Sequence, residues 1–205
     1  MLASLSTPTA IQADGRSARA ARTRDAVVEA LLTLIEEGDL RPTAQRVAEQ
    51  ARVSLRSVFQ HFRDLESLFA AAADRQVERL GPAPLDLPPD APLEERLDAF
   101  VAGRSRILEQ ISPVRRAARL QEPFSEEIAL RLRWSRNAFR TEAERLFAPE
   151  LAARPESQRR ELLAALAAAS DWNAWEALRQ HNELSVQEAR RAMRRTMHAM
   201  LKEGR

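Results

Sequence analysis

The chain has 205 residues and a formal net charge of +2, a length that can bury one large core or two modest ones. It contains no cysteine, which excludes a disulfide framework and thiolate chemistry. It has no apolar run of membrane-spanning length and no signal-peptide core at the N-terminus, so we expect a soluble, cytoplasmic protein. Alanine-rich apolar runs, only five glycines and no strand pattern of sufficient length predict an all-α fold.

The charge distribution is weak evidence about partners. Arginine supplies nearly all the positive charge, because Lys202 is the only lysine. Between Arg16 and Leu68 the basic and acidic side chains almost balance. A nucleic-acid partner must therefore be argued from a motif and not from bulk charge.

The first residues show no periodicity. Residues 1–15 are small and polar, and we expect them to be disordered. Arg16, Arg19, Arg22 and Arg24 follow, with no acidic residue before Asp25. This arginine run has two interpretations: a solvated start of a helix, or an arm against DNA phosphates or in the minor groove.

A first amphipathic helix is predicted from about Ala20 to Glu37. Its apolar stripe has helical spacing and consists of Val27, Leu31, Leu34 and Ile35. Gly38 is a natural C-terminal stop for this helix. Pro42 then keeps Arg41 out of helical conformation.

The stretch from Thr43 to Phe62 contains two short helical patterns separated by Arg52 and its neighbours. Thr43 and Ser54 are suitable N-caps for the two helices, because their side-chain oxygens can accept from free backbone N–H groups. The buried faces are predicted to consist of Val47, Ala48 and Ala51 on the first helix and Val58 and Phe62 on the second. Such a short connection sets the helices at a steep angle, as in a helix-turn-helix unit.

The second of these helices has the features of a DNA-reading helix. Leu55, Arg56, Phe59 and Gln60 should face outward, opposite the core stripe. Arg can contact guanine and Gln can contact adenine through paired hydrogen bonds, so Arg56 and Gln60 are the predicted base readers, and Leu55 could contact a thymine methyl group. We expect Thr43, Ser57 and His61 to hold phosphates.

This stretch resembles the DNA-binding motif of TetR-family transcriptional regulators. The matching residues are Thr43, Val47, Ala48, Ala51, Val53, Ser54, Ser57, Val58, Phe59, His61, Phe62, Glu66 and Leu68. The resemblance covers about the first third of the chain. It implies a DNA-binding domain over residues 16–63 and a helical effector-binding and dimerisation domain over residues 64–205.

Three positions depart from the family pattern. Arg52 stands where the family usually has Gly, Phe59 replaces a usual Tyr, and Leu65 replaces a Lys that touches the DNA backbone. Arg52 or Arg63 could supply the phosphate contacts that are lost at the other two positions. The candidate DNA-binding residues are Arg22, Thr43, Arg52, Ser54, Leu55, Arg56, Ser57, Phe59, Gln60, His61 and Arg63.

Prolines and caps predict the boundaries of the middle helices. Asp64 should cap a helix to about Leu80, and the proline-rich residues 81–92 should form a loop. We expect the next helix to run from Leu93 to Ile111, with Pro113 as a break and a short helix over Val114–Leu120. Ser125 should cap a further helix that stops before Pro149.

The last two helices are predicted to form an antiparallel pair. The first should run from about Pro155 to Gln180, and the second should begin at Ser185, where Ser185 and Glu188 form a capping box. The second helix carries the apolar stripe Val186, Ala189, Met193, Met197 and Met200. This stripe, the alanines of 164–169 and the tryptophans Trp172 and Trp175 are either ordinary core or a dimer seam. We favour a homodimer through residues 157–201, which the resemblance also implies.

The resemblance further implies a small-molecule effector within the C-terminal domain. The candidate lining residues are Phe100, Arg104, Trp134, Asn137, Phe139, Trp172 and Asn173. The alternative is that the aromatic side chains are core and the polar ones are solvated. Nothing in the sequence identifies the effector.

An enzyme is not expected. The chain has no Cys, no Tyr and three His, and His181 and His198 lack the spacing of metal ligands. No nucleophile elbow or phosphate-binding glycine loop occurs, so we expect neither a cofactor nor a metal. The predicted function is a regulator, of the repressor type, that a small molecule releases from a palindromic operator. The alternative is an architectural, nucleoid-associated helix-turn-helix protein without a ligand switch.

Overall fold

The computed structural model of the chain describes residues 9–80 and 87–203, and every regular element in these residues is helical. The helices of the first part are α1 (Thr9–Glu36), α2 (Ala44–Ala51), α3 (Leu55–His61) and α4 (Leu65–Leu80). The second part contains α5 (Leu93–Gln121), the 3-10 segment η1 (Glu122–Phe124), α6 (Glu126–Leu146), α7 (Ala148–Ala152), α8 (Glu156–Ala169), α9 (Trp172–Glu176), the π-helical segment η2 (Ala177–His181) and α10 (Val186–Lys202). The predicted all-α fold is confirmed.

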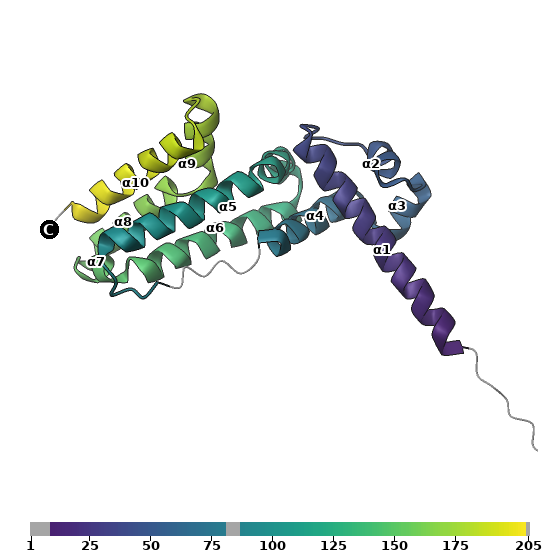
Figure 1. Cartoon of the computed structure of the whole chain (residues 1–205), viewed down its shortest axis with the longest axis horizontal. Helices are drawn as coiled ribbons and strands as arrows, with labels where there is room; N and C mark the ends of the chain where they lie inside the picture. Colours follow the sequence, from purple (N-terminus) through teal and green to yellow (C-terminus); the bar gives the residue numbers. More distant parts are fainter. Residues whose placement is uncertain (1–8, 81–86, 204–205) are drawn as a thin grey trace, which may run out of the picture.

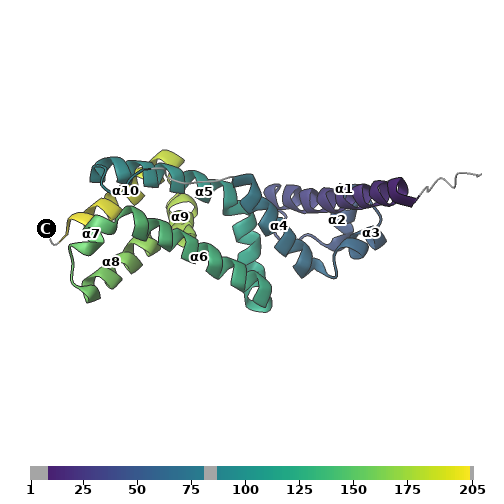
Figure 2. The same ribbon diagram turned by 90° about the horizontal axis from the view of Figure 1, so that it is seen from below.

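The helices form an elongated molecule with a head and a body (Figures 1 and 2). Helices α1, α2 and α3 make up the head at one end, and α4 leads from the head to the body. Helices α5 and α6 run along the body, α7, α8 and α10 lie toward the end away from the head, and α9 packs against α5 near the middle of the body. The helix-turn-helix motif is therefore presented at one tip of the molecule.

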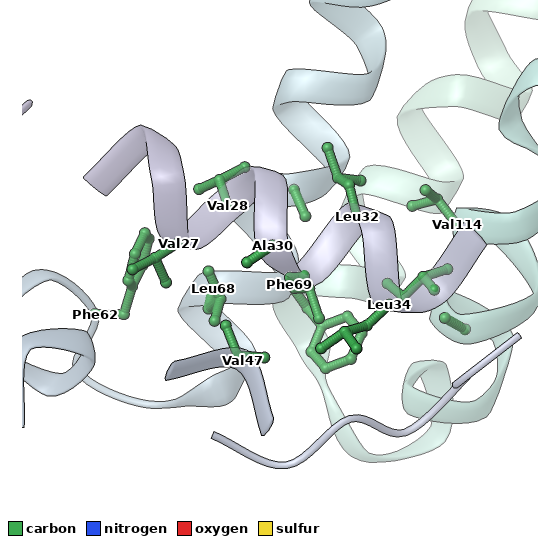
Figure 3. Close-up of a cluster of buried hydrophobic side chains, with 14 of the residues drawn as sticks. Val27, Val28, Ala30, Leu32, Leu34, Val47, Phe62, Leu68, Phe69 and Val114 are labelled. Atoms are coloured by element: carbon green, nitrogen blue, oxygen red, sulfur yellow. The ribbon is translucent and has the colours of Figure 1, made fainter. Parts of the chain in front are cut away.

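The head has a continuous apolar core that extends into the body (Figure 3). Val27 and Leu31 of α1 are fully buried, together with Val47 of α2 and Leu68 of α4. The same cluster includes residues from the second half of α5 and the first half of α6, namely Val114, Ala117, Ala118, Ile128 and Leu132. Because apolar burial is shared across these helices, the head is joined to the body by packing as well as by chain connection.

A second core fills the far end of the body. Phe100 and Phe147 pack edge to face, with ring centroids 5.4 Å apart, and Trp175 is fully buried beside them. Met193 and Met197 of α10 are buried in the same cluster. The methionine stripe is therefore core of one protomer, and the interpretation that placed it at a dimer seam is wrong for these two residues.

The predicted caps are present. Gly38 has φ +98° and ends α1, and the N–H of Asp39 donates to the carbonyl of Leu34 over 2.9 Å, as in a Schellman motif. Ser125 accepts from the N–H of Ile128 at the start of α6. Ser185 and Glu188 form the full capping box of α10.

The first helix begins earlier than its sequence pattern predicts. Helix α1 starts at Thr9 and not near Ala20, so residues 9–15, predicted to be disordered, are helical. Alanine and arginine are strong helix formers, and no proline lies between Pro8 and Pro42, which allows the helix to extend beyond its packed stripe. Residues 1–8, to which the same prediction applied, lie outside the described residues.

Pro113 does not end its helix. Helix α5 continues through it to Gln121, and its last part turns away from the direction of the rest (Figure 2). A proline removes one backbone donor and disturbs the carbonyls one turn before it. Here the side chain of Gln76 donates to the Gln110 carbonyl over 3.0 Å, which compensates one of those carbonyls. The helix therefore bends where the sequence predicted a break.

The predicted single helix from Pro155 to Gln180 is also different in the structure. Helix α8 ends at Ala169, and Asp171 caps α9 by accepting from the N–H of Ala174 over 2.8 Å. The segment then continues as the π-helical η2. A Ser-Asp pair favours caps over helix interior, because both side chains compete for backbone hydrogen bonds.

Candidate DNA-binding site and effector cavity

The helix-turn-helix unit has the local geometry that its sequence predicts. The side chain of Thr43 accepts from the N–H of Arg46 over 3.3 Å, and the side chain of Ser54 accepts from the N–H of Ser57 over 3.1 Å. Val58 and Phe62 are buried against the head core. These contacts fix the position of α3 against α2 and α1.

Arg52 adopts the left-handed conformation in the turn, with φ 56° and ψ 41°. Its N–H donates to the carbonyl of Glu49 over 3.1 Å, and the N–H of Val53 donates to that of Ala48 over 3.0 Å. Glycine, which the family usually has at this position, adopts such a conformation most readily. The left-handed region is costly for a residue with a Cβ atom, by roughly 1 kcal/mol.

Replacing Arg52 by Gly should therefore stabilise the protein by about 0.5–1 kcal/mol, because glycine adopts this conformation without a steric cost. Urea denaturation of the variant and the wild type measures the difference. If Arg52 also contacts a phosphate, the same variant binds DNA less tightly. An unchanged or lower stability would contradict the assignment of strain to this turn.

One face of α3 is exposed to solvent. Leu55 is 39% exposed and Phe59 is 48% exposed, although both are large apolar side chains. Arg56 and Gln60 are exposed on the same helix, and within the described residues neither makes an ion pair or a side-chain hydrogen bond. The positions predicted to read bases are thus available to a ligand that covers this face.

The predicted phosphate contacts surround this face. Thr43, Arg52 and Ser54 are exposed, whereas Ser57 and His61 are partly buried. Arg63 is exposed but is paired with Asp64, its Nε lying 2.8 Å from the carboxylate. Arg52, in contrast, makes no ion pair among the described residues.

Helix α1 also contributes to this surface. Arg22 is exposed, as a phosphate contact requires. The guanidinium of Arg24 lies over the ring of Phe62, with its central carbon 5.1 Å from the centroid. This cation–π contact ties α1 to the end of α3. In the sequence, Arg24 is recognisable only as part of an arginine run. Its contact with Phe62 could not be predicted, because it depends on how α1 and α3 cross.

A cavity of about 1200 Å³ lies in the body between α4, α5 and α6. Its apolar lining comes from all three helices and includes Val77, Leu80, Ile107, Ile111, Val114 and Leu132. Pockets for small molecules are mostly apolar with a few polar groups, and this cavity is at least as large as is usual for them. It adjoins the head, because Val114 and Leu132 belong to the head core as well.

Only some of the predicted effector-binding residues lie at the cavity. Trp134, Asn137 and Phe139 line the cavity, and Trp134 is 63% exposed at its edge. Phe100 and Trp172 do not line it, because both are buried in the second core. Asn173 is exposed elsewhere and donates to Asp171. The helical period of the sequence could not distinguish cavity-lining residues from core residues, since it does not show which face of each helix borders a cavity.

Arg104 lies just behind the cavity wall. Its guanidinium is between the rings of Phe100 and Phe139, 4.8 Å and 3.8 Å from their centroids, and it pairs with Glu142 over 2.6 Å. Burial lowers the pKa of Arg104 to about 10 and outweighs the opposing effect of Glu142. Arg104 is still charged at neutral pH, so it holds Phe139 and Glu142 in place on the wall.

Several lining residues were missed by the sequence analysis. Gln76 of α4, Arg115 of α5 and Arg131 of α6 all border the cavity. Arg131 spans two helices, pairing with Asp74 over 3.0 Å and with Glu127 over 2.8 Å. A polar residue within an amphipathic helix is most simply interpreted as solvated, and the sequence alone does not show that the faces carrying these residues border a cavity.

The described part of the chain has neither a candidate metal cluster nor a candidate membrane-spanning helix. Residues 9–80 and 87–203 contain no cluster of His, Cys, Asp or Glu that could hold a metal ion. None of the helices in the same ranges is both long and apolar enough to cross a membrane.

Known proteins resemble this chain in structure. No family model and no curated protein sequence matches it. A crystal structure of a transcriptional regulator from Rhodococcus sp. Rha1 superposes with a TM-score of 0.67 at 20% identity, over 87% of this chain and 96% of the other. A TetR-family transcriptional regulator from Rhodococcus sp. gives 0.65 at 18% identity, over 88% and 100%, and a TetR regulator from Rhodococcus sp. RHA1 gives 0.53 at 19%, over 89% and 97%. The chain therefore has the fold of the TetR-family transcriptional regulators.

Proposed function

We propose that this protein is a TetR-family regulator, of the repressor type, that binds a palindromic DNA operator and leaves it when a small molecule occupies the cavity. The observation that carries the proposal is the free face of α3. Arg56 and Gln60 lie exposed and unpaired on the second helix of a capped helix-turn-helix unit. That arrangement suits the major groove, where Arg and Gln can read base edges.

The experiment is a binding-site selection with the full-length protein at fixed salt. A regulator should enrich one palindromic motif, because a two-fold dimer presents the same helix to both half-sites. Compounds that bind are first identified because they raise the melting temperature of the protein. The affinity of the protein for the selected operator is then measured with and without each of these compounds. Binding without a motif, together with no response to such compounds, would instead support an architectural DNA-binding protein.

Helix α4 is the element that we propose couples the cavity to the head. Its side chains Gln76 and Val77 face the cavity, and its Arg75 pairs with Asp25 of α1 over 2.7 Å. Arg79 of α4 pairs with Glu36 of α1 over 3.2 Å. A ligand that displaces α4 would therefore carry α1 and the recognition helix with it. A coupling of about 1–3 kcal/mol, or roughly 5–150-fold in operator affinity, would be typical.

We propose that the dimer forms through the outer faces of α8 and α10. These helices contact each other in the protomer. Their inner faces are core, but Ala164 and Ala168 of α8 and Ala199 of α10 are exposed. Small exposed side chains allow helices of two copies to approach closely, and a helix-turn-helix reader generally works as a two-fold dimer.

Replacing Ala168 by Arg should weaken the dimer by about tenfold or more, because a long charged side chain would be forced into a close helix contact. Sedimentation at micromolar concentration measures the oligomeric state, and operator affinity should fall with it. Ala152→Arg on α7, also exposed, is the matched control and should remain dimeric. A wild-type protein that is already monomeric at this concentration would refute the proposed dimer.

A further inference from the structure

The buried polar atoms that lack a hydrogen-bond partner gather around one place. Among the described residues these side-chain atoms are Gln76 Oε1, Arg104 Nε, Arg104 Nη1 and Arg115 Nε. Gln76 and Arg115 line the cavity, and Arg104 touches two residues that line it. Buried polar groups are normally satisfied, so a group of exceptions at a cavity indicates that an absent partner belongs there.

Arg115 is the most informative of these residues. It is only 7% exposed, and its single side-chain hydrogen bond is a long one, from Nη1 to Ser135 Oγ over 3.4 Å. One face of its guanidinium lies over Trp172, 5.8 Å from the ring centroid. In the described part of the chain no carboxylate lies within ion-pair distance of it, whereas Arg104 and Arg131, its neighbours at the cavity, both have one.

The surroundings of Arg115 add positive charge. Arg119 and Arg136 both pair with the single carboxylate of Glu122, over 2.9 Å and 3.6 Å. Burial, and next the nearby charge of Arg136, lower the pKa of Arg115 to about 10, although the carboxylates of Glu122 and Asp171 act in the opposite direction. The side chain remains protonated at neutral pH and is a buried cation with no carboxylate at ion-pair distance among the described residues. Such a charge is unfavourable until it is paired.

The rest of the cavity favours an apolar body and a single negative charge. Val77, Ile107 and Ile111 provide apolar walls from α4 and α5. Asp74 and Glu142 also border the cavity, and each is already paired with an arginine. A second negative charge on the ligand would face these carboxylates, so a monoanion fits better than a dianionic phosphate.

We propose that the cavity binds amphipathic carboxylates, with the carboxylate paired to Arg115 and the apolar body lying along Val77, Ile107 and Ile111. This rests on the proposed function, since it names the chemical class of the effector for that regulator. Arg is suited to the role because its planar guanidinium can donate two parallel hydrogen bonds to a carboxylate.

The test measures binding of matched probes to the full-length protein without DNA, by calorimetry at neutral pH. The probes are decanoate with decanamide and 2-naphthoate with 2-naphthamide, each pair having one apolar body and differing in charge. The wild type should bind at least one carboxylate about tenfold or more tightly than its amide. Equal binding within both pairs, or no binding of either carboxylate, overturns the proposal.

Variants locate the preference at Arg115. Arg115→Gln should remove the preference for the carboxylate while leaving amide binding within about twofold. Arg115→Lys should retain part of the preference for the carboxylate, because the positive charge remains although the two parallel donors of the guanidinium are lost. Arg106→Gln, on the exposed side of α5, is the matched control and should behave as the wild type. A preference that survives in Arg115→Gln overturns the assignment.

Failure of the carboxylate site can be distinguished from failure of the proposed regulatory function. Carboxylate binding that leaves operator affinity unchanged would support this site and contradict release by an effector. Operator release by a neutral compound, with no carboxylate bound, would support the regulator and contradict this site.

Discussion

Replacing Glu150 by Gln should destabilise the protein by about 3–5 kcal/mol, because it leaves Arg96 as a buried charge without its anion. The two side chains form a bidentate pair, with Nη1 and Nη2 of Arg96 2.8 Å and 2.6 Å from the carboxylate oxygens. Both residues are buried, at 3% and 2% exposure. The pair ties the start of α5 to α7, and Arg96 also donates to the carbonyl of Leu146, at the end of α6, over 2.6 Å.

The free energy of unfolding from urea denaturation measures this effect. Glu144→Gln is the matched control, because Glu144 is an exposed carboxylate on α6, and it should change stability by less than about 0.5 kcal/mol. The double variant Arg96→Met with Glu150→Leu should recover much of the loss, since apolar pairs of similar size often replace buried ion pairs without cost. A loss below about 1 kcal/mol for Glu150→Gln would show that the pair is solvated in solution.

The features of the fold that could be predicted are those determined by interactions between residues close together in the sequence. A cap depends on residues within one turn, so Thr43, Ser54 and Ser185 could be identified from spacing alone. The left-handed conformation of Arg52 was indicated by the resemblance, because the family usually has Gly at this position. The exposed face of α3 followed from the period of a helix once Val58 and Phe62 were placed inside.

The parts that could not be predicted depend on distant contacts. Pro113 reads as a break, and only the donation of Gln76 to the Gln110 carbonyl shows why the helix can continue. From the sequence, the methionine stripe on α10 is compatible with the core of one protomer or with a dimer interface. The burial of Met193 and Met197 inside the protomer assigns these two residues to the core. The cavity is the extreme case, because a void is defined by three helices, and the role of Arg115 at its wall needs all of them.

The exposed face of α3, which we propose reads bases, leads to the prediction with the largest expected effect on function. Arg56 is exposed on α3, four residues from Gln60 and on the side away from the buried Val58. In the major groove, a bidentate contact from Arg to guanine is worth about 1–3 kcal/mol per site. A dimer on a palindrome makes the contact twice, so the loss would be about 2–6 kcal/mol over the operator.

Replacing Arg56 by Ala should therefore weaken operator binding by roughly 30-fold or more and flatten base preference at one position of each half-site. Ser57→Ala should instead weaken all sequences about equally, because a phosphate contact carries no sequence information. Binding-site selection with each variant beside the wild type, at one salt concentration, separates the two effects. Val58 keeps the orientation of α3 in both variants, so a change in folding does not explain a difference between them. If Arg56→Ala selects the same motif as the wild type, the recognition helix meets DNA through a different face, and Arg56 does not read a base.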